Sequence, residues 1–567
     1  MTAPTVTDTS EAELLTRVLS ALLREDVVGL RSRSTPVHRP DGDWLRLPTT
    51  EDALLLPVAD DGYQCEHRAR LPLLVRESDG TELTSYGTVL GALRELAEPV
   101  DRDGFDAFAE ECRQTLDTMR LHARTRDEVD QRLTDRYGDD PARWTGLAYD
   151  TLAARLDHPV YPTARGRAGL SEEQLRAFAP EFHPRFALRW LALPRAAATL
   201  TGPLPELWPT PARLGLPEVE QTHVALPVHP LTVGAPLDQA LRSTGLLGRA
   251  LLAEQAYLEV VPTLSMRTVA VAADPSLHLK LPLATATLGL RNKRSIKPGT
   301  LVDGAAGQRL VEAVIAREPR FRDTILHADE TTYAYAEHEL LAVLCRRLPA
   351  GLEDSVVVPL AALLAQAPGG RLVLDHLADR FYGGDPPALL DACLSLLFDW
   401  QTTLFGYGIA LESHQQNVSL VLGAGGLRLL FKDNDGPRVN ASRLAAVLPG
   451  PWGFDDPRTF TVGDGPVADV FATITVHLCA GAYAFGLTEH REALLALVRE
   501  RLAQAVDRLG GDAGAALRAH VLDAPRLPVK AMVTAGTLLS KERSGAADVN
   551  KHYTSGPNYL LSDGGSA

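Results

Sequence analysis

The segment of residues 408–436, GIALESHQQNVSLVLGAGGLRLLFKDNDG, holds the residue types best suited to bind a metal ion and phosphate. Within it, two strand-like runs, 418–422 and 427–431, flank a short loop of Gly and Ala. A four-residue hairpin loop would pair Leu422 with Leu427. Counting outward from this pair predicts the register of the whole hairpin and brings its two polar flanks together at one open end.

Hard oxygen ligands meet at that open end. The register sets Val418 against Phe431, Asn417 against Lys432 and Gln416 against Asp433, and it gathers Glu412, His414 and Asn417 beside Asp433 and Asp435. Such a cluster suits Mg²⁺, which takes one or two carboxylates and fills its other positions with water and substrate phosphates. The alternative is that these polar residues only solvate the end of a hairpin.

The spacing of the cluster is also typical of phosphate chemistry. Glu412 precedes Asn417 by five residues, and a hairpin then leads to Asp433. Protein kinases and small-molecule phosphotransferases order a catalytic carboxylate, a metal-binding Asn and a metal-binding Asp in this way. The sequence has neither the kinase loop G-x-G-x-x-G before this segment nor a Walker A stretch G-x-x-x-x-G-K-[ST]. The pattern predicts a nucleotide and Mg²⁺ site and excludes an ordinary kinase.

A second segment concentrates positive charge. PTLSMRTVAV begins at Pro262, and HLKLPLATATLGLRNKRSIKPG begins at His278. Ser265 and Arg267 alternate along what reads as a strand, so both are expected on one face. Six cations occur here: Arg267, Lys280, Arg291, Lys293, Arg294 and Lys297. Because unpaired charges in apolar runs are costly, a clamp for polyphosphate or polycarboxylate is predicted, although residues 293–297 fit a solvated basic loop equally well.

Composition bounds the class of protein. The chain has 567 residues and a net charge of −15, and 45% of its residues are hydrophobic. An acidic chain is a poor ligand for nucleic acid or an anionic membrane, so neither partner is expected. Five scattered cysteines without a C-x-x-C pair fit neither zinc nor a disulfide framework. The sequence predicts no signal peptide and no stretch of about 18 apolar residues, the densest apolar stretch being 356–367. We expect a cytoplasmic enzyme with reduced, buried cysteines.

The elements that must position these residues are mixed. Apolar residues at helical spacing predict a helix over 11–24 and further helices over 307–316, 336–347 and 388–404. Short strand candidates alternate with turns over 222–290 and predict a sheet. The loop HPVYPTARGRAG from His158 and a Pro-Gly-Gly turn at 368–370 read as boundaries. The fold class is therefore α+β.

Several motifs occur together in one order. They are HPVYPTARGRAG at 158, APEFHP at 179, LPVHPLT at 226, PTLSMRT at 262, the stretch from Lys280 to Arg291, ESHQQN at 412, the Lys-Asp pair at 432–433 and LPVKAMV at 527. This ordered set resembles the NRPS-independent siderophore (NIS) synthetases, the aerobactin-synthetase-like ATP-dependent ligases, over about residues 158–540.

The resemblance implies an architecture. Members of the family have an α+β fold shaped like a cupped hand and are commonly dimeric. We therefore expect a thumb-like lobe at 1–157, a fingers-like lobe with the ATP and acid strands at 158–368, and a palm-like lobe with the Mg²⁺ hairpin at 369–567.

The resemblance also implies site residues. ATP would be bound by His158, Ser265, Arg267, Lys280, Thr287, Arg291 and Asn417, Mg²⁺ by Glu412 and Asp433, and the catalytic residues would be His414, Arg291 and Lys280. The chain departs from the family pattern in three places. Tyr161 and Arg165 replace a His and a Lys, and no Arg follows closely after Lys530.

The implied activity is a ligase with ATP and Mg²⁺ as cofactors. It would adenylate a polycarboxylic acid, with citrate or a citryl derivative first, and condense it with an amine or alcohol in siderophore biosynthesis. Two alternatives stay open on the residues alone. One is a small-molecule phosphotransferase with the kinase-like spacing, and the other is a ferric-siderophore binding protein that uses the cationic pocket.

Overall fold

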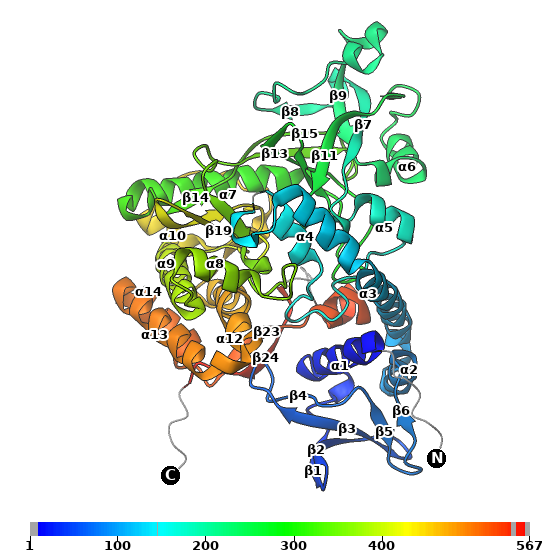
Figure 1. The fold of residues 1–567 in the computed structure, drawn as a ribbon, viewed down its shortest axis with the longest axis vertical. Helices are drawn as coiled ribbons and strands as arrows, with labels where there is room; N and C mark the ends of the chain where they lie inside the picture. Colours follow the sequence, from blue (N-terminus) through cyan, green and yellow to red (C-terminus); the bar gives the residue numbers. More distant parts are fainter. Residues whose placement is uncertain (1–8, 145, 546–550, 562–567) are drawn as a thin grey trace.

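The computed structural model describes residues 9–144, 146–545 and 551–561. Helices and sheets alternate through these ranges (Figure 1), which confirms the α+β class. The predicted N-terminal helix is α1 (Thr9–Arg24), and its apolar positions are buried. The further helices of the first part are α2 (Tyr86–Leu96), α3 (Arg102–Tyr137), α4 (Ala148–Ala154) and α5 (Glu172–Phe178).

A six-stranded antiparallel sheet forms the base of the molecule in Figure 1, below α1. Its path is β1 (Thr35–Arg39), β2 (Gly42–Pro48), β3 (Ala53–Asp60), β5 (Leu74–Arg76) and β6 (Glu82–Leu83), and β4 (His67–Ala69) pairs with β3. One hydrophobic cluster joins this sheet and α1 to helices from the C-terminal part of the chain. The two ends of the sequence are therefore packed into one core.

A nine-stranded sheet forms the opposite end of the molecule (Figure 1). Its path is β10 (Leu251–Leu252), β7 (Phe186–Pro194), β11 (Tyr257–Pro262), β12 (Thr268–Val271), β13 (Asp274–Lys280), β16 (Ala342–Arg347), β15 (Asp329–Tyr335) and β8 (Thr199–Thr201), with β9 (His223–Val228) on β7. Helix α6 (Ala235–Ser243) follows β9. The sheet predicted within 222–290 is confirmed.

One predicted helix is wrong. The segment 336–347 was expected to be helical, but β16 occupies most of it. Five successive residues from Ala342 to Arg346 are buried, since β16 lies between β13 and β15 inside the sheet. A strand covered on both faces reads as a continuous apolar run, and periodicity does not separate such a run from a buried helix.

The predicted hairpin is confirmed in register. It consists of β19 (Val418–Gly423) and β20 (Gly426–Phe431), with Val418 opposite Phe431 and Leu422 opposite Leu427. Pairing extends one step further than predicted, to Gly423 opposite Gly426, so only two residues form the loop. β14 (Ile325–His327) and β17 (Val356–Pro359) flank the hairpin in a four-stranded sheet.

Helices surround this sheet. The predicted helices at 307–316 and 388–404 lie within α7 (Pro298–Arg317) and α9 (Pro386–Gly406), and α8 (Val373–Phe381) precedes α9. The remaining elements are β18 (Ile409–Ala410), β21 (Arg438–Asn440), α10 (Ala441–Val447), β22 (Phe460–Thr461), α11 (Gly465–Val470), α12 (Ala482–Gly486), α13 (Arg491–Leu509), α14 (Gly511–Leu517), β23 (Arg526–Lys530), α15 (Lys541–Ser544) and β24 (Tyr553–Pro557).

α11 and α12 are joined by a π-helical stretch, Phe471–Gly481. Together they form one helix, Gly465–Gly486, which is long and apolar enough to cross a membrane by length and composition, although 94% of its most apolar window is buried inside the protein. The expectation that 356–367 is the densest apolar stretch is thus corrected. All five cysteines are free and buried, as predicted.

Candidate active site

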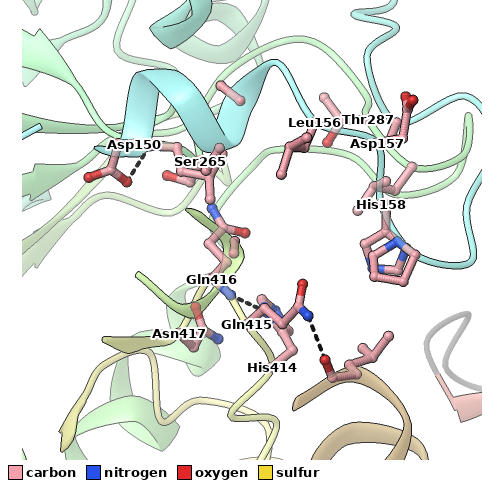
Figure 2. Close-up of a pocket in the computed structure, with 18 of the residues that line it drawn as sticks. Asp150, Leu156, Asp157, His158, Ser265, Thr287, His414, Gln415, Gln416 and Asn417 are labelled. Carbon is pink, nitrogen blue, oxygen red and sulfur yellow. Dashed lines mark hydrogen bonds between the residues drawn. The ribbon is translucent and has the colours of Figure 1, made fainter. Parts of the chain in front are cut away.

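A cavity of about 820 Å³ lies between four parts of the chain. They are α4, the part of the nine-stranded sheet that includes the β11–β12 turn with β13 and β16, the open end of the hairpin, and the helix Gly465–Gly486. The cavity volume is within the range of small-molecule sites. Nine of the ten predicted site residues line it: His158, Ser265, Arg267, Lys280, Thr287, Glu412, His414, Asn417 and Asp433. Figure 2 shows that His158 and Thr287 face His414, Gln415 and Gln416 across this space. Segments far apart in sequence therefore supply one site.

Ser265 and Arg267 reach the cavity from a tight turn, not from a strand. β11 ends at Pro262 and β12 begins at Thr268, so the residues between them form the connection. Met266 has a φ of 63°, in the left-handed region that side chains rarely adopt. Two bonds hold the turn: Ser265 Oγ accepts from Thr268 N at 3.1 Å, and Asp150 Oδ1 accepts from Leu264 N at 2.9 Å. The predicted strand is wrong, yet both side chains still line the cavity.

Asp433 is the centre of a buried ion network. Lys280, at the end of β13, forms an ion pair with it, and Arg346 Nη2 lies 3.4 Å from its Oδ1. Its own backbone N–H donates to both carboxylate oxygens of Glu330, at 3.0 and 3.1 Å. Burial raises the pKa of Asp433, but the Lys280 and Arg346 cations outweigh burial and hold it well below the usual range. Asp433 is therefore ionised at neutral pH.

A second acid adjoins this network. Asp435 Oδ2 lies 3.4 Å from Lys280 Nζ. Burial raises the pKa of the Asp435 carboxyl, while Lys280 opposes that rise. Lys280 is only 4% exposed, so it is held between two carboxylates and is directed into the cavity floor. Lys280 is therefore a desolvated cation, and its attraction for a phosphate or carboxylate in the cavity is stronger than it would be in water.

Sequence reasoning named Arg294 only as one cation of the basic run, in a segment that fitted a solvated loop equally well, and it missed Arg346 and Glu330. Arg294 and Arg346 line the cavity, and Glu330 forms an ion pair with Arg346. Burial, with a contribution from nearby Arg267, lowers the pKa of Arg294 to about 9, and its Nε is buried without a hydrogen-bond partner. Arg346 lies in the segment mistaken for a helix, and Glu330 carries no motif. Only the basic composition of 293–297 offered a signal, and it pointed to Arg294.

Arg291, the tenth predicted site residue, is not among the residues that line this cavity. Its loop is anchored to the C-terminal segment: Arg291 N donates to Gly536 O at 3.0 Å, and Leu290 N donates to Glu111 Oε1 at 2.9 Å. One nitrogen of its guanidinium, Nη1, is buried without a hydrogen-bond partner. Arg294, three residues further along the same loop, does line the cavity.

The two cavity histidines are neutral hydrogen-bonding groups. His158 Nδ1 accepts from Tyr161 N at 3.1 Å, and His414 Nδ1 accepts from Gln416 N at 3.3 Å. Each ring therefore carries its proton on Nε2. Burial lowers the pKa of His158 to about 3, and burial also lowers the pKa of His414 to about 4. His414 can therefore offer a carboxylate a hydrogen bond from Nε2, but not a positive charge.

The open end of the hairpin carries oxygen donors suited to Mg²⁺. Glu412 and Asp433 both line the cavity, and Asn417 Nδ2 donates to Glu412 O at 3.1 Å. Lys551 Nζ lies 3.0 Å from Glu412 Oε1. Among the described residues, no group of three or more His, Cys, Asp and Glu side chains is arranged to hold a metal ion. Two carboxylates fit an ion that takes its other ligands from water and substrate phosphates.

The residues that depart from the family pattern have different surroundings. Tyr161 is fully buried and donates to Glu111 Oε2 at 3.1 Å, so it faces the core and not the cavity. Arg165 lines the cavity and donates to Asp157 Oδ2 at 2.7 Å. Lys530 also lines the cavity. Of the replaced positions, only 165 keeps a cation at the site.

Two family models match this chain, and both matched regions contain residues that line the cavity. The sequence model of the IucA / IucC family matches residues 147–365, which include the turn at 263–267 and β13. The model described as ferric iron reductase FhuF-like transporter matches residues 388–544, which include the hairpin. Most of the residues that line the cavity thus lie in regions that family models match, while Glu13 and Tyr63 lie outside them.

Full-length relatives are distant in sequence. Rhizobactin siderophore biosynthesis protein RhbC of Rhizobium meliloti (strain 1021) is 23% identical, over 91% of this chain and 92% of its own length. The citryl-spermidine/3,4-dihydroxybenzoyl-citryl-spermidine:spermidine ligase of Bacillus anthracis is 23% identical, over 74% of each chain.

Solved structures share the fold. Petrobactin biosynthesis protein AsbB from Bacillus anthracis str. Sterne has a TM-score of 0.75 at 17% identity, covering 97% of this chain and 95% of its own. The ATP-bound aerobactin synthetase IucA from a hypervirulent pathotype of Klebsiella pneumoniae has a TM-score of 0.66 at 19% identity, covering 97% of this chain and 100% of its own. The resemblance read from the motifs is confirmed: residues 147–365 are an IucA / IucC family region, in a chain with the fold of the NIS synthetases.

Proposed function

We propose that this protein is an ATP-dependent ligase of siderophore biosynthesis that activates a carboxylate as its acyl-adenylate and joins it to an amine or alcohol. The observation that carries the proposal is the cavity itself. Eight cationic side chains line it, among them Arg267, Lys280, Arg294 and Arg346, together with the carboxylates of Glu412 and Asp433. Names of the relatives, a siderophore biosynthesis protein and a citryl-spermidine ligase, support the same class of reaction.

ATP enters as a substrate whose phosphates meet the cations. Ser265 and Arg267 on the tight turn, with Lys280 and Thr287, are the proposed phosphate contacts. His158 Nε2 and the Asn417 side chain are proposed to bind the part of the nucleotide beyond these phosphates. α4 supplies an apolar wall for the base through Ala153 and Ala154, beside the turn that Asp150 holds. The ATP bound to the structural neighbour IucA supports this substrate.

Adenylation needs little proton chemistry from the protein. A carboxylate is already ionised at neutral pH, so its attack on the α-phosphorus requires no general base. The requirement is instead to neutralise the negative charge of two anions brought together, and Arg267, Lys280 and Arg294 supply it in a desolvated site. His414 Nε2–H is proposed to orient the acid by a hydrogen bond. Glu412 and Asp433 are proposed to hold Mg²⁺, which when bound would neutralise phosphate charge.

The acid is proposed to be polycarboxylic, with citrate or a citryl derivative first. Several cations line the same cavity, and one relative is named as a ligase of citryl-spermidine. α-Ketoglutarate or a dicarboxylic monoamide ranks next. A panel of acids with hydroxylamine as the trapping nucleophile tests this choice, since acetate matching citrate would contradict a multiply cationic acid site.

One measurement separates the ligase from its closest rival. The hairpin register, which sets Glu412, Asn417 and Asp433 at kinase-like spacing, favours a small-molecule phosphotransferase as the second candidate. A ligase releases AMP and pyrophosphate, and a phosphotransferase releases ADP. We expect acid-dependent AMP and pyrophosphate. ADP with a phosphorylated acid would refute the ligase, and tight binding of ferric chelates without any nucleotide turnover would favour the third reading, a ferric-siderophore binding protein.

The larger organisation is also proposed. We propose thumb-like, fingers-like and palm-like lobes at 1–157, 158–368 and 369–567, a homodimer and a cytoplasmic location. The four-stranded sheet takes β14 and β17 from one side of residue 368 and β19 and β20 from the other. The last two lobes would therefore share a sheet, and limited proteolysis should release them together.

A further inference from the structure

The cavity has an apolar half that the proposed adenylation does not use. The helix Gly465–Gly486 lines it with Ile474, Leu478, Ala482 and Phe485. These positions are separated by four, four and three residues, so they lie on one side of the helix. We call this side, together with Tyr63 and Leu364, which also line the cavity, the apolar half.

The walls of the apolar half are closed by direct contacts. The rings of Tyr63 and Phe485 lie 4.9 Å apart, and Tyr63 donates its hydroxyl to His477 O at 3.0 Å, so its polar atom faces away from the space. On the other side, a Cβ at Gly486 would come within 2.5 Å of Leu364 Cδ1, which means that this leucine lies against the helix. The apolar half is thus a built wall and not a gap between loops.

The apolar half begins beside the proposed reaction centre. Gln415, next to His414 in the chain, donates to Leu478 O at 2.6 Å and accepts from Ala361 N at 3.0 Å through its backbone carbonyl. These bonds fix the segment that carries His414 onto the helix Gly465–Gly486. A molecule that reaches a carboxylate at His414 from this side must lie along the apolar half.

Two further acids of the cavity are already compensated. Asp157 is paired with Arg17 and Arg165, and Glu13 lies 3.7 Å from Arg165. Both acids and Lys530 line the same cavity as the apolar half. A second ammonium group on the incoming molecule would therefore meet cations and paired carboxylates. An uncharged hydrocarbon chain would lie against apolar side chains and lose no charge hydration.

We propose that the apolar half binds the hydrocarbon arm of the nucleophile, so that the preferred acceptor is a primary amine or alcohol on an uncharged alkyl or aryl chain. This inference rests on the proposed function. In the step concerned, the amine nitrogen forms a bond to the acyl carbon and the bond from that carbon to the adenylate oxygen breaks. AMP leaves with the electron pair, and one amine proton passes to solvent. Polyamines and amino acids are disfavoured acceptors.

The test uses the full chain and primary amines of increasing length, from methylamine to hexylamine, with 1,6-diaminohexane and serine as charged counterparts. Hydroxylamine, which needs no arm, reports adenylation separately. We expect kcat/KM to rise about fourfold for each methylene that becomes buried. We expect hexylamine to exceed both charged counterparts. Equal rates along the series, or a preference for diaminohexane or serine, would overturn the inference while the hydroxylamine reaction still supports the ligase.

Two variants locate the effect. Leu364→Asn places an amide of similar size in the wall and should flatten the length series, whereas Ala482→Leu should shift the optimum to a shorter arm. Leu372→Asn is the matched control, since Leu372 is half-buried in the same hydrophobic cluster but does not line the cavity. If Leu364→Asn instead raises KM for ATP and leaves the amine series unchanged, the base of ATP occupies this space and the inference fails. Absence of acid-dependent pyrophosphate release from every acid would refute both proposals.

Discussion

At the scale of single residues, the positive charge of the cavity depends on which arginine of the basic loop lines it. Arg291 and Arg294 lie in one basic loop, and both were candidates by composition. The loop buries a guanidinium nitrogen of each without a hydrogen-bond partner, but only Arg294 lines the cavity. A desolvated cation stabilises a developing anion far more than an exposed one does. The two arginines therefore make a matched pair for mutation.

The first prediction compares these two residues. Arg294→Gln should lower the rate of acid-dependent pyrophosphate release on the order of 10²–10³-fold, because it removes a charge that faces the phosphates or the acid. Arg291→Gln should have a far smaller effect, since its side chain does not line the cavity. Steady-state kinetics at saturating Mg²⁺ measure both. A larger loss of rate for Arg291→Gln than for Arg294→Gln would mean that Arg291 is the site residue.

The second prediction concerns the proposed metal ligands. Both side chains are largely buried, with 22% of Glu412 and 23% of Asp433 exposed. Asp433→Asn should reduce both activity and stability, because it leaves Lys280 and Arg346 without their shared anion. Glu412→Gln should reduce activity with a smaller change in melting temperature. Near-normal turnover of Glu412→Gln would remove Glu412 from the site.

At the scale of elements, the local parts of the site were predictable and the non-local parts were not. The hairpin register followed from two apolar runs and a Gly-rich loop, because adjacent strands pair through their connection. The turn at 263–267 and the strand β16 were misread. Asp150 holds the turn across 114 residues of sequence, and β16 is defined by its neighbours in the sheet. Arg346 and Glu330, which complete the ion network, therefore carried no signal in the sequence.

The third prediction tests how α7 positions the segment after the hairpin. A Cβ at Gly307 would clash with the backbone carbonyl of Asn434, whereas one at Gly304 would meet Asp435 Cβ at 3.7 Å, an ordinary contact. Gly307→Ala should displace the segment that carries Asp433 and Asp435, cost about 1–3 kcal/mol and lower activity. Gly304→Ala should be neutral or stabilise the helix by up to about 1 kcal/mol. Thermal unfolding and kinetics of the pair measure both; similar behaviour would mean that α7 does not constrain the segment.

At the scale of the whole molecule, burial of histidines makes stability depend on pH. His158, His183, His229, His278 and His327 all have pKa values lowered to about 3 by burial. In the unfolded chain each returns to about 6.5. Between these values the unfolded chain binds protons that the folded chain does not, so the free energy of unfolding rises with pH across this window. The stability is fully present above about pH 6.5 and is lost as the pH falls towards 3.

The fourth prediction measures this dependence at His229. This residue is fully buried outside the cavity, and its Nδ1 accepts from Leu231 N at 3.2 Å, a bond that an Asn oxygen can replace. His229→Asn should reduce the slope of unfolding free energy against pH between 6.5 and 4 by up to one proton. Urea unfolding at several pH values checks it. An unchanged slope would mean that His229 takes up no proton on unfolding.

The helix Gly465–Gly486 is sheltered by residues that are synthesised after it. His477 contacts Pro528 O at 3.0 Å and the Tyr559 hydroxyl at 2.9 Å, the latter 82 residues further along the chain. At about 5–20 residues per second a ribosome needs about 4–16 s to supply that last partner. Throughout this interval the helix has only the native contacts that earlier residues such as Tyr63 and Leu364 supply, so the completion of its cover is tied to the completion of translation. A chain released before β24 would be left permanently in that condition and should aggregate.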